Sequence, residues 1–148
     1  MLIIFVLGCG GTLSTPTGVI TSPNYPNFYS VRTDCIWTIV RPPGNTIEVS
    51  FTDMDLEQST NCSYDFVEVR DGSYLTSPLL GRYCGSIKPA LIRSTSNHIR
   101  ILFRSDGNQV SKGFRLQYTG SKSQICFLSG QYNRKYLAYT TYIVFNLG

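Results

Sequence analysis

The sequence has few charged residues and few of the side chains that enzymes use most often. Only 15% of its 148 residues are charged, and His98 is its single histidine. It contains no G-x-S-x-G, H-E-x-x-H or phosphate-loop motif, and no C-x-x-C pair from which a closed zinc site could form. A lone histidine with no acid near it in sequence gives little basis for a catalytic triad. We therefore predict a protein that is not an enzyme.

Long runs of basic or apolar residues are also missing. The 13 basic and 9 acidic residues give a formal charge of +4, with no lysine or arginine run that would follow a phosphate backbone, so we expect no nucleic-acid partner. The apolar residues 1–7 are too short to cross a bilayer, so we expect no direct membrane insertion. We interpret residues 1–8 as a truncated signal peptide or as the remnant of a preceding exon or domain of a larger secreted chain.

No stretch of the chain has a convincing helical period. Turn residues instead recur every eight to twelve positions, and short runs between them alternate apolar and polar residues, which puts each apolar set on one face of a strand. The alternating apolar sets are Ile47, Val49 and Phe51; Val67 and Val69; Ile99, Ile101 and Phe103; and Phe114, Leu116 and Tyr118. The denser run at 35–40 is typical of an inner strand. This pattern predicts an all-β sandwich or barrel.

The strand pattern fades after Tyr118. Residues 120–124 resemble a linker rich in Ser, Lys and Gly, and residues 125–148 have little turn punctuation and no clear register. We therefore expect 120–148 to be a linker and an atypical, poorly ordered tail outside the main core, with one extra edge strand as the alternative. This tail contains the fifth cysteine, Cys126.

The other four cysteines are well separated along the chain. In a β-rich sequence such spacing predicts two disulfides and an oxidising compartment, so we expect a secreted or cell-surface location. The residues are Cys9, Cys35, Cys62 and Cys84. The triplet that begins at Asn61 fits the N-glycosylation pattern, although a cysteine in its middle position is expected to reduce its use.

Three acidic residues lie in predicted loops. Glu57 and Asp65 flank Cys62 between two predicted strands, and Asp106 follows another strand. Because alternate loops of a sandwich gather at one end, these carboxylates could meet there, where they would repel one another unless a cation neutralised them. An oxygen-only ligand set favours calcium. The alternative is that they are ordinary surface acids that serve in turns.

Several motifs, in a fixed order, resemble one known family. They are CGG at 9–11, SPNYPNFY at 22–29, CIW at 35–37, YDFVEVRDG at 64–72, GRYCG at 81–85, FRSDG at 103–107 and KGF at 112–114. Together they resemble a CUB domain that covers residues 9–119, most similar to the modules of multi-CUB receptors. The resemblance implies a two-sheet, jelly-roll-like CUB β-sandwich with the disulfides Cys9–Cys35 and Cys62–Cys84.

The resemblance also implies a calcium site. Its acidic ligands would be Glu57, Asp65 and Asp106, with Gly107 and Asn108 completing the shell. The family's supporting tyrosine falls on Tyr29, which we expect to form an apolar wall beside a bound ligand. A lysine or arginine of a protein ligand would then pair with oxygens of the three acids, and acidification or chelation would release it.

The resemblance therefore implies a calcium-dependent protein-interaction module of an endocytic or scavenger-type receptor, with neighbouring CUB or other extracellular modules. Three alternatives remain open. The module could be a non-catalytic exosite or dimerisation module of a secreted protease, a spermadhesin-like carbohydrate-binding protein, or a disulfide-bonded spacer without a ligand.

Overall fold

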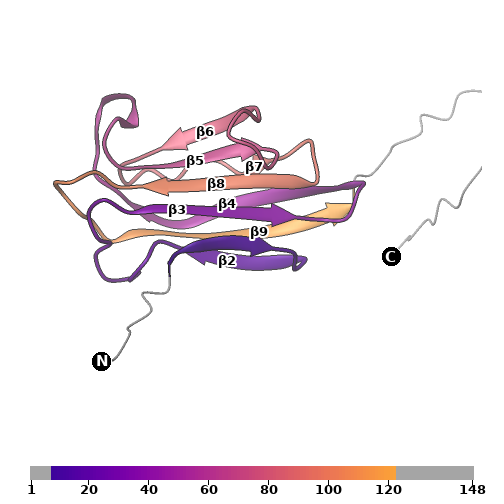
Figure 1. Ribbon diagram of the computed structural model, residues 1–148, viewed down its shortest axis with the longest axis horizontal. Helices are drawn as coiled ribbons and strands as arrows, with labels where there is room; N and C mark the ends of the chain where they lie inside the picture. The colour runs from indigo at the N-terminus through magenta and orange to yellow at the C-terminus, as the bar shows by residue number, and fades with distance from the viewer. Residues whose placement is uncertain (1–7, 123–148) are drawn as a thin grey trace, which may run out of the picture.

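A computed structural model describes residues 8–122, which form two packed β-sheets (Figure 1). The five-stranded sheet has the order β1 (Gly10–Leu13), β3 (Asp34–Val40), β8 (His98–Arg104), β5 (Phe66–Asp71), β6 (Leu79–Tyr83). The four-stranded sheet has the order β2 (Thr17–Thr21), β9 (Gly113–Lys122), β4 (Asn45–Asp55), β7 (Ile92–Arg93). Only β1 and β3 pair in parallel among these strands. The predicted all-β sandwich is confirmed.

The core lies between the two sheets and is built from the alternating apolar sets. Phe114 on β9 is fully buried and contacts aromatic rings from both sheets. Its ring centroid lies 5.4 Å from that of Phe103, 6.1 Å from that of Trp37 and 6.0 Å from that of Phe51. Such tilted and edge-to-face pairs stabilise a core beyond the area that they bury. Phe114 therefore joins the two sheets at the centre of the sandwich.

Two disulfides tie peripheral segments to this core. Cys9 is bonded to Cys35 at a Cα–Cα distance of 5.2 Å, which fastens the start of β1 to β3. Cys62 is bonded to Cys84 at 5.4 Å, which fastens the short 3-10 helix η1 (Thr60–Cys62) to the end of β6. Closing loops of 26 and 22 residues contributes about 3 kcal/mol each in the chain-entropy model. Both predicted pairings are confirmed.

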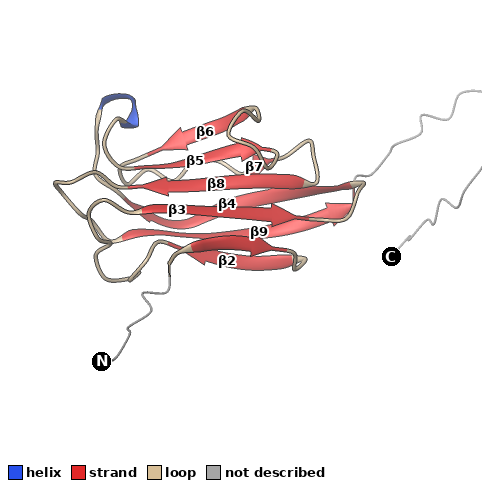
Figure 2. Cartoon of the chain, viewed as in Figure 1, coloured by secondary structure: helices blue, strands red, loops and turns tan. Residues whose placement is uncertain are grey.

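Three connections gather at one end of the sandwich. The β2–β3 connection, the β4–β5 connection with η1 and the β8–β9 turn all lie there (Figure 2). They meet because β5 and β3 both pair antiparallel with β8, so their first residues lie beside its last. The chain enters β1 at this end, and β9 finishes at the opposite end (Figure 1).

Strand β9 is longer than the sequence pattern predicted. Residues 120–122, expected to begin a linker, pair with Asn45–Ile47 of β4, where Gly120 is opposite Ile47 and Lys122 is opposite Asn45. Backbone pairing needs no apolar side chain, so the polar composition of this segment hid the strand. The expected apolar segment at 1–7 and the tail at 123–148 with Cys126 lie outside the described residues. Within residues 8–122, no helix has the length and apolar character needed to cross a bilayer.

Candidate metal centre

The structure brings together the three acids that the sequence singled out. Glu57 follows β4, Asp65 precedes β5 and Asp106 follows β8, all at the end where the loops gather. One carboxylate oxygen from each of the three lies within 4.8 Å of the other two. Because β5 and β8 are neighbours in the sheet, the residue before β5 and the loop after β8 are held side by side. Glu57 is added by the loop that connects β4 to β5.

Asp65 is the central member of this acidic cluster of Glu57, Asp65 and Asp106. It is fully buried, and its two oxygens accept different hydrogen bonds. Oδ2 accepts from the Tyr29 hydroxyl at 2.6 Å, and Oδ1 accepts from the Asp106 amide at 2.7 Å. The same Tyr29 hydroxyl accepts from the Glu57 amide at 3.3 Å. Asp65 and Tyr29 therefore connect all three loops beneath the cluster.

The burial of Tyr29 corrects one expectation. Its side chain is only 2% exposed, and its ring packs edge-on against Phe103 at 5.2 Å, so it supports the acids from below and does not form an exposed wall. Burial, together with the hydrogen bond to Asp65, raises the pKa of Tyr29 far above its ordinary value, so the hydroxyl remains a donor. Asp65 is likewise too deeply buried to contact a ligand side chain, which leaves Glu57 and Asp106 as the accessible acids.

Asp106 is held by its own turn. Its Oδ1 accepts from the Asn108 amide at 2.8 Å, and its Oδ2 accepts from the Asn108 side chain at 3.4 Å. Its carbonyl accepts from the Arg32 amide at 2.6 Å, and a Cβ on Gly107 would lie 3.4 Å from the Arg32 Nε atom. Sequence reasoning missed Arg32, because nothing in its own sequence context links it to a turn so far along the chain.

The three carboxylates lack an internal counter-charge. None of them forms an ion pair with a basic side chain within residues 8–122. Glu57 Oε2 is buried and has no hydrogen-bond partner in this part of the chain. Desolvation, followed by the charges of Asp106 and Asp65, raises the pKa of Glu57. An orphaned carboxylate oxygen beside two further carboxylates fits a divalent cation that prefers oxygen ligands, as calcium does.

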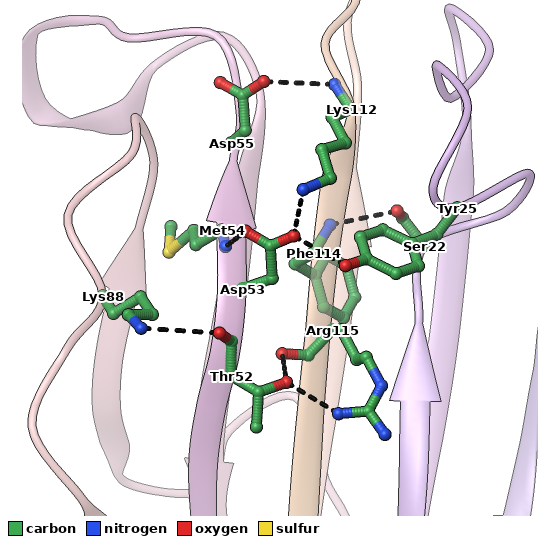
Figure 3. A network of polar contacts seen from close by, with 10 residues as sticks. All are labelled: Ser22, Tyr25, Thr52, Asp53, Met54, Asp55, Lys88, Lys112, Phe114 and Arg115. Carbon is green, nitrogen blue, oxygen red and sulfur yellow. Dashed lines mark hydrogen bonds and ion pairs between the residues drawn. The ribbon is translucent and has the colours of Figure 1, made fainter.

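A polar network fixes the end of β4 just before Glu57 (Figure 3). Asp53 forms an ion pair with the Lys112 ammonium and accepts a hydrogen bond from the Tyr25 hydroxyl at 2.6 Å. The Lys112 amide donates to Asp55 at 3.4 Å. Hydrogen bonds from Lys112 and Tyr25 lower the pKa of Asp53, which keeps the network charged. Strand β4, the start of β9 and the segment around Tyr25 are therefore joined directly beside the cluster.

Asn61 of the predicted glycosylation triplet is exposed and lies in η1. Its backbone has a φ of 56°, a left-handed conformation that asparagine tolerates better than most residues. The side chain of Asn61 therefore lies on the surface of the loop that carries Glu57 and Asp65.

These observations define a class: an all-β sandwich module closed by two disulfides, with an acidic cluster suited to a cation at one end. The family model of the CUB domain matches residues 9–118, and the chain belongs to this family. The expected resemblance is thereby confirmed.

Relatives of known name support the assignment. The chain is 47% identical to human tolloid-like protein 1 over 110 residues and 40% identical to pig cubilin over 125 residues, which is 74% and 84% of this chain. It spans only 11% and 3% of the length of these two relatives. Among solved structures, the Ca2+-bound CUB2 domain of MASP-1 matches with a TM-score of 0.68 and 35% identity, over 75% of this chain and 98% of that one.

Proposed function

We propose that residues 9–119 form an extracellular, non-catalytic protein-interaction module that binds calcium and, through it, basic side chains of a protein ligand. The observation that carries this proposal is the grouping of three carboxylate oxygens within 4.8 Å, one member of which has a buried oxygen without a partner. The Ca2+-bound state of the MASP-1 domain supports the choice of cation. Two disulfides support the extracellular location.

Glu57, Asp65 and Asp106 would hold the calcium ion, with Gly107 and Asn108 completing its shell. Calcium would supply positive charge that cancels the repulsion among the carboxylates. Asp65 would fix the site from below, because it is buried and already bonded to Tyr29. The partly exposed Glu57 and Asp106 would then present oxygens to an incoming lysine or arginine.

Two exposed aromatic residues adjoin the site in sequence. Phe28, which precedes Tyr29, is 65% exposed, and Tyr64, which precedes Asp65, is 51% exposed. Exposed rings of this kind can cover the aliphatic stem of a lysine or arginine while its charged end reaches an acid. Phe28 and Tyr64 would therefore form the apolar wall beside the ligand that the sequence analysis expected of Tyr29. Such a wall favours a ligand side chain with a long apolar stem.

The biological role of the module would depend on the longer protein that contains it. Similarity to cubilin supports a place in an endocytic or scavenger-type receptor among neighbouring extracellular modules. The higher identity to tolloid-like protein 1 favours a second candidate, a non-catalytic exosite or dimerisation module of a secreted protease. In either setting a single basic contact is weak, and repeated modules would strengthen binding by multivalency.

Calcium should raise the melting temperature of the full chain, because binding to the folded state alone stabilises it. At a concentration ten times its Kd, the gain in unfolding free energy should be about 1.4 kcal/mol, with a Kd in the range of about 10⁻⁴–10⁻³ M for an extracellular site. Calorimetric titration and thermal melting test this directly.

The matched control for that titration is a second glutamate outside the cluster. Glu57→Ala should abolish both the heat of binding and the melting shift. Glu48→Ala should retain both, because Glu48 is paired with Arg93 on the four-stranded sheet. An equal shift in the two variants would refute the proposed calcium site.

Ligand recognition should require both calcium and the charge of the ligand. A peptide that carries lysine should bind the calcium-loaded chain, and its glutamine counterpart should bind at least about tenfold more weakly, because a charge-assisted contact contributes about 1.5–3 kcal/mol. EDTA and Asp106→Ala should each remove the difference in affinity between the lysine peptide and its glutamine counterpart. Fluorescence anisotropy with labelled peptides measures it, and equal binding in EDTA would contradict the mechanism.

A further inference from the structure

The outer face of the five-stranded sheet carries a second feature that the acidic cluster does not explain. A depression of about 410 Å³ lies over β3, β8, β5 and β6, and the β5–β6 hairpin borders it. Its lining combines guanidinium groups with apolar side chains, including Arg70, Arg82, Arg100, Ile36, Phe66 and Leu75. This face lies along the strands, whereas the acidic cluster lies in the loops at their end.

The acids in this depression are already paired with arginines. Glu68, only 2% exposed, uses one oxygen for Arg70 at 2.6 Å and the other for Arg82 at 2.8 Å. Asp34 pairs with Arg104 at 2.6 Å. Two carboxylates therefore pair with three arginines on this face, and neither of them pairs with the fourth arginine. The lining keeps an excess of positive charge, because four arginines face only two acids.

That fourth arginine is Arg100, at the middle of β8. It is only 9% exposed, and its Nη1 atom is buried without a hydrogen-bond partner in the part of the chain that the structure describes. Across the sheet its direct neighbours are Arg70 on β5 and Thr38 on β3, neither of which is an acid. A desolvated guanidinium without a counter-charge is unfavourable, so a carboxylate placed in the depression would stabilise it strongly.

Apolar side chains surround this charge. Leu75 is 63% exposed and Ile36 is 42% exposed, while Phe66 is covered by the Arg82 guanidinium at 4.1 Å from its ring centroid. Exposed aliphatic groups beside an unpaired cation match a ligand that has both a carboxylate and apolar neighbours. A sulfated polysaccharide would instead favour a row of free cations, and here three of the four arginines already pair with a carboxylate.

We propose that this depression docks an acidic segment of a protein partner, with one carboxylate on Arg100 and flanking apolar side chains on Ile36 and Leu75. Nη1 is buried, so a rotation of the long Arg100 side chain toward the depression would be needed to bring it to the incoming carboxylate. This contact is independent of calcium. The module thus has two recognition surfaces of opposite charge preference, one at the loop end and one on the sheet.

The test uses the full chain labelled with ¹⁵N, in EDTA, with the peptide acetyl-Leu-Glu-Val-Glu-Leu-amide as the probe. The peptide should perturb the NMR signals of Arg100, Arg70 and Ile36, and the counterpart with glutamine in place of glutamate should bind about tenfold more weakly. Arg100→Gln should weaken binding by a similar factor, whereas Arg93→Gln, on the other sheet, should leave it unchanged. Leu75→Glu, at an exposed position, should also weaken binding by adding a negative charge to the rim.

The following results would overturn the proposal. No perturbation at millimolar peptide, equal binding by the glutamine peptide, or unchanged binding in both folded Arg100→Gln and Leu75→Glu overturns it. A heparin-derived oligosaccharide that binds these residues when the peptide does not overturns the choice of ligand. Glu57→Ala should retain peptide binding, so failure of the calcium proposal and failure of this one are distinguishable.

Discussion

Replacing Asp65 by alanine should abolish calcium binding and lower the unfolding free energy of the calcium-free protein by about 2–4 kcal/mol. The carboxylate is fully buried and accepts from the Tyr29 hydroxyl and the Asp106 amide. Its removal leaves both donors without a partner, and each such loss costs about 1–3 kcal/mol. Denaturant unfolding in EDTA and calorimetric titration with calcium measure the two effects separately.

Asp106→Ala is the matched control for this experiment. It should also abolish calcium binding but destabilise the calcium-free protein less, because its carboxylate, within residues 8–122, is bonded only to Asn108 of its own turn. Tyr29→Phe should destabilise the fold while leaving all three carboxylates in place. If Asp65→Ala unfolded in EDTA at the wild-type denaturant midpoint, Asp65 could not be the structural centre of the acidic cluster.

Replacing Glu68 by glutamine should destabilise the protein by about 2–3 kcal/mol at neutral pH. The side chain is 2% exposed and pairs with both Arg70 and Arg82. Glutamine keeps one acceptor oxygen but removes the negative charge, so two guanidinium groups lose their counter-charge and one of them loses its acceptor. We expect less than the full cost of breaking a buried ion pair, because the Arg82 side chain is 40% exposed and can be solvated.

The same residue gives the fold a defined pH dependence. Burial alone would raise the pKa of Glu68, but hydrogen bonds from Arg82 and Arg70 outweigh burial and hold it below the ordinary value of 4.5. A lowered pKa contributes stability above the unfolded value that is lost as the pH falls through the folded value. Wild-type stability should therefore decline below about pH 4.5, and the decline should be shallower in Glu68→Gln.

The control for Glu68 is the exposed pair of Glu48 and Arg93. Both side chains of this pair are at least 37% exposed, so Glu48→Gln should change stability by less than about 1 kcal/mol. Chemical denaturation over an acid pH series compares the three proteins. Identical acid profiles for wild type and Glu68→Gln would show that Glu68 makes no contribution to the pH dependence.

The sequence predicted the inner face of the sandwich well, since a period of two identifies which side chains point the same way. Ile47, Val49, Ile99 and Ile101 are all fully buried, as that pattern requires. It could not predict the outer face. Leu102 is 6% exposed although it lines the depression on the outer face, where its direct neighbours on the adjacent strands are Ile36 and Glu68. Alternation assigns a face but does not say what covers it.

The sequence predicted which residues form the acidic cluster, but it did not predict how deeply the residues that support the cluster are buried. The motif order placed Glu57, Asp65 and Asp106 together, and one oxygen of each does lie within 4.8 Å of the others. Nothing in the sequence showed that Tyr29 lies beneath the acids, because burial depends on how the β2–β3 connection packs against β8. The role of Arg32 depends on a backbone contact to Asp106, which no local pattern encodes.

The arrangement of the two ends bears on how the module would respond to mechanical tension. The chain enters β1 at the end where the loops gather, where Cys9 is covalently bonded to Cys35 of β3, and β9 finishes at the opposite end of the sandwich (Figure 1). A pull through residues 1–7 would pass across the Cys9–Cys35 bond into β3, so β1 would not peel away first. A pull beyond Lys122 would load the hydrogen bonds of β9 with β2 and β4 in shear, all at once along the strand. Tension applied at the two ends of the described residues would therefore load the disulfide and the hydrogen bonds of β9 before it could peel β1 from the sheet.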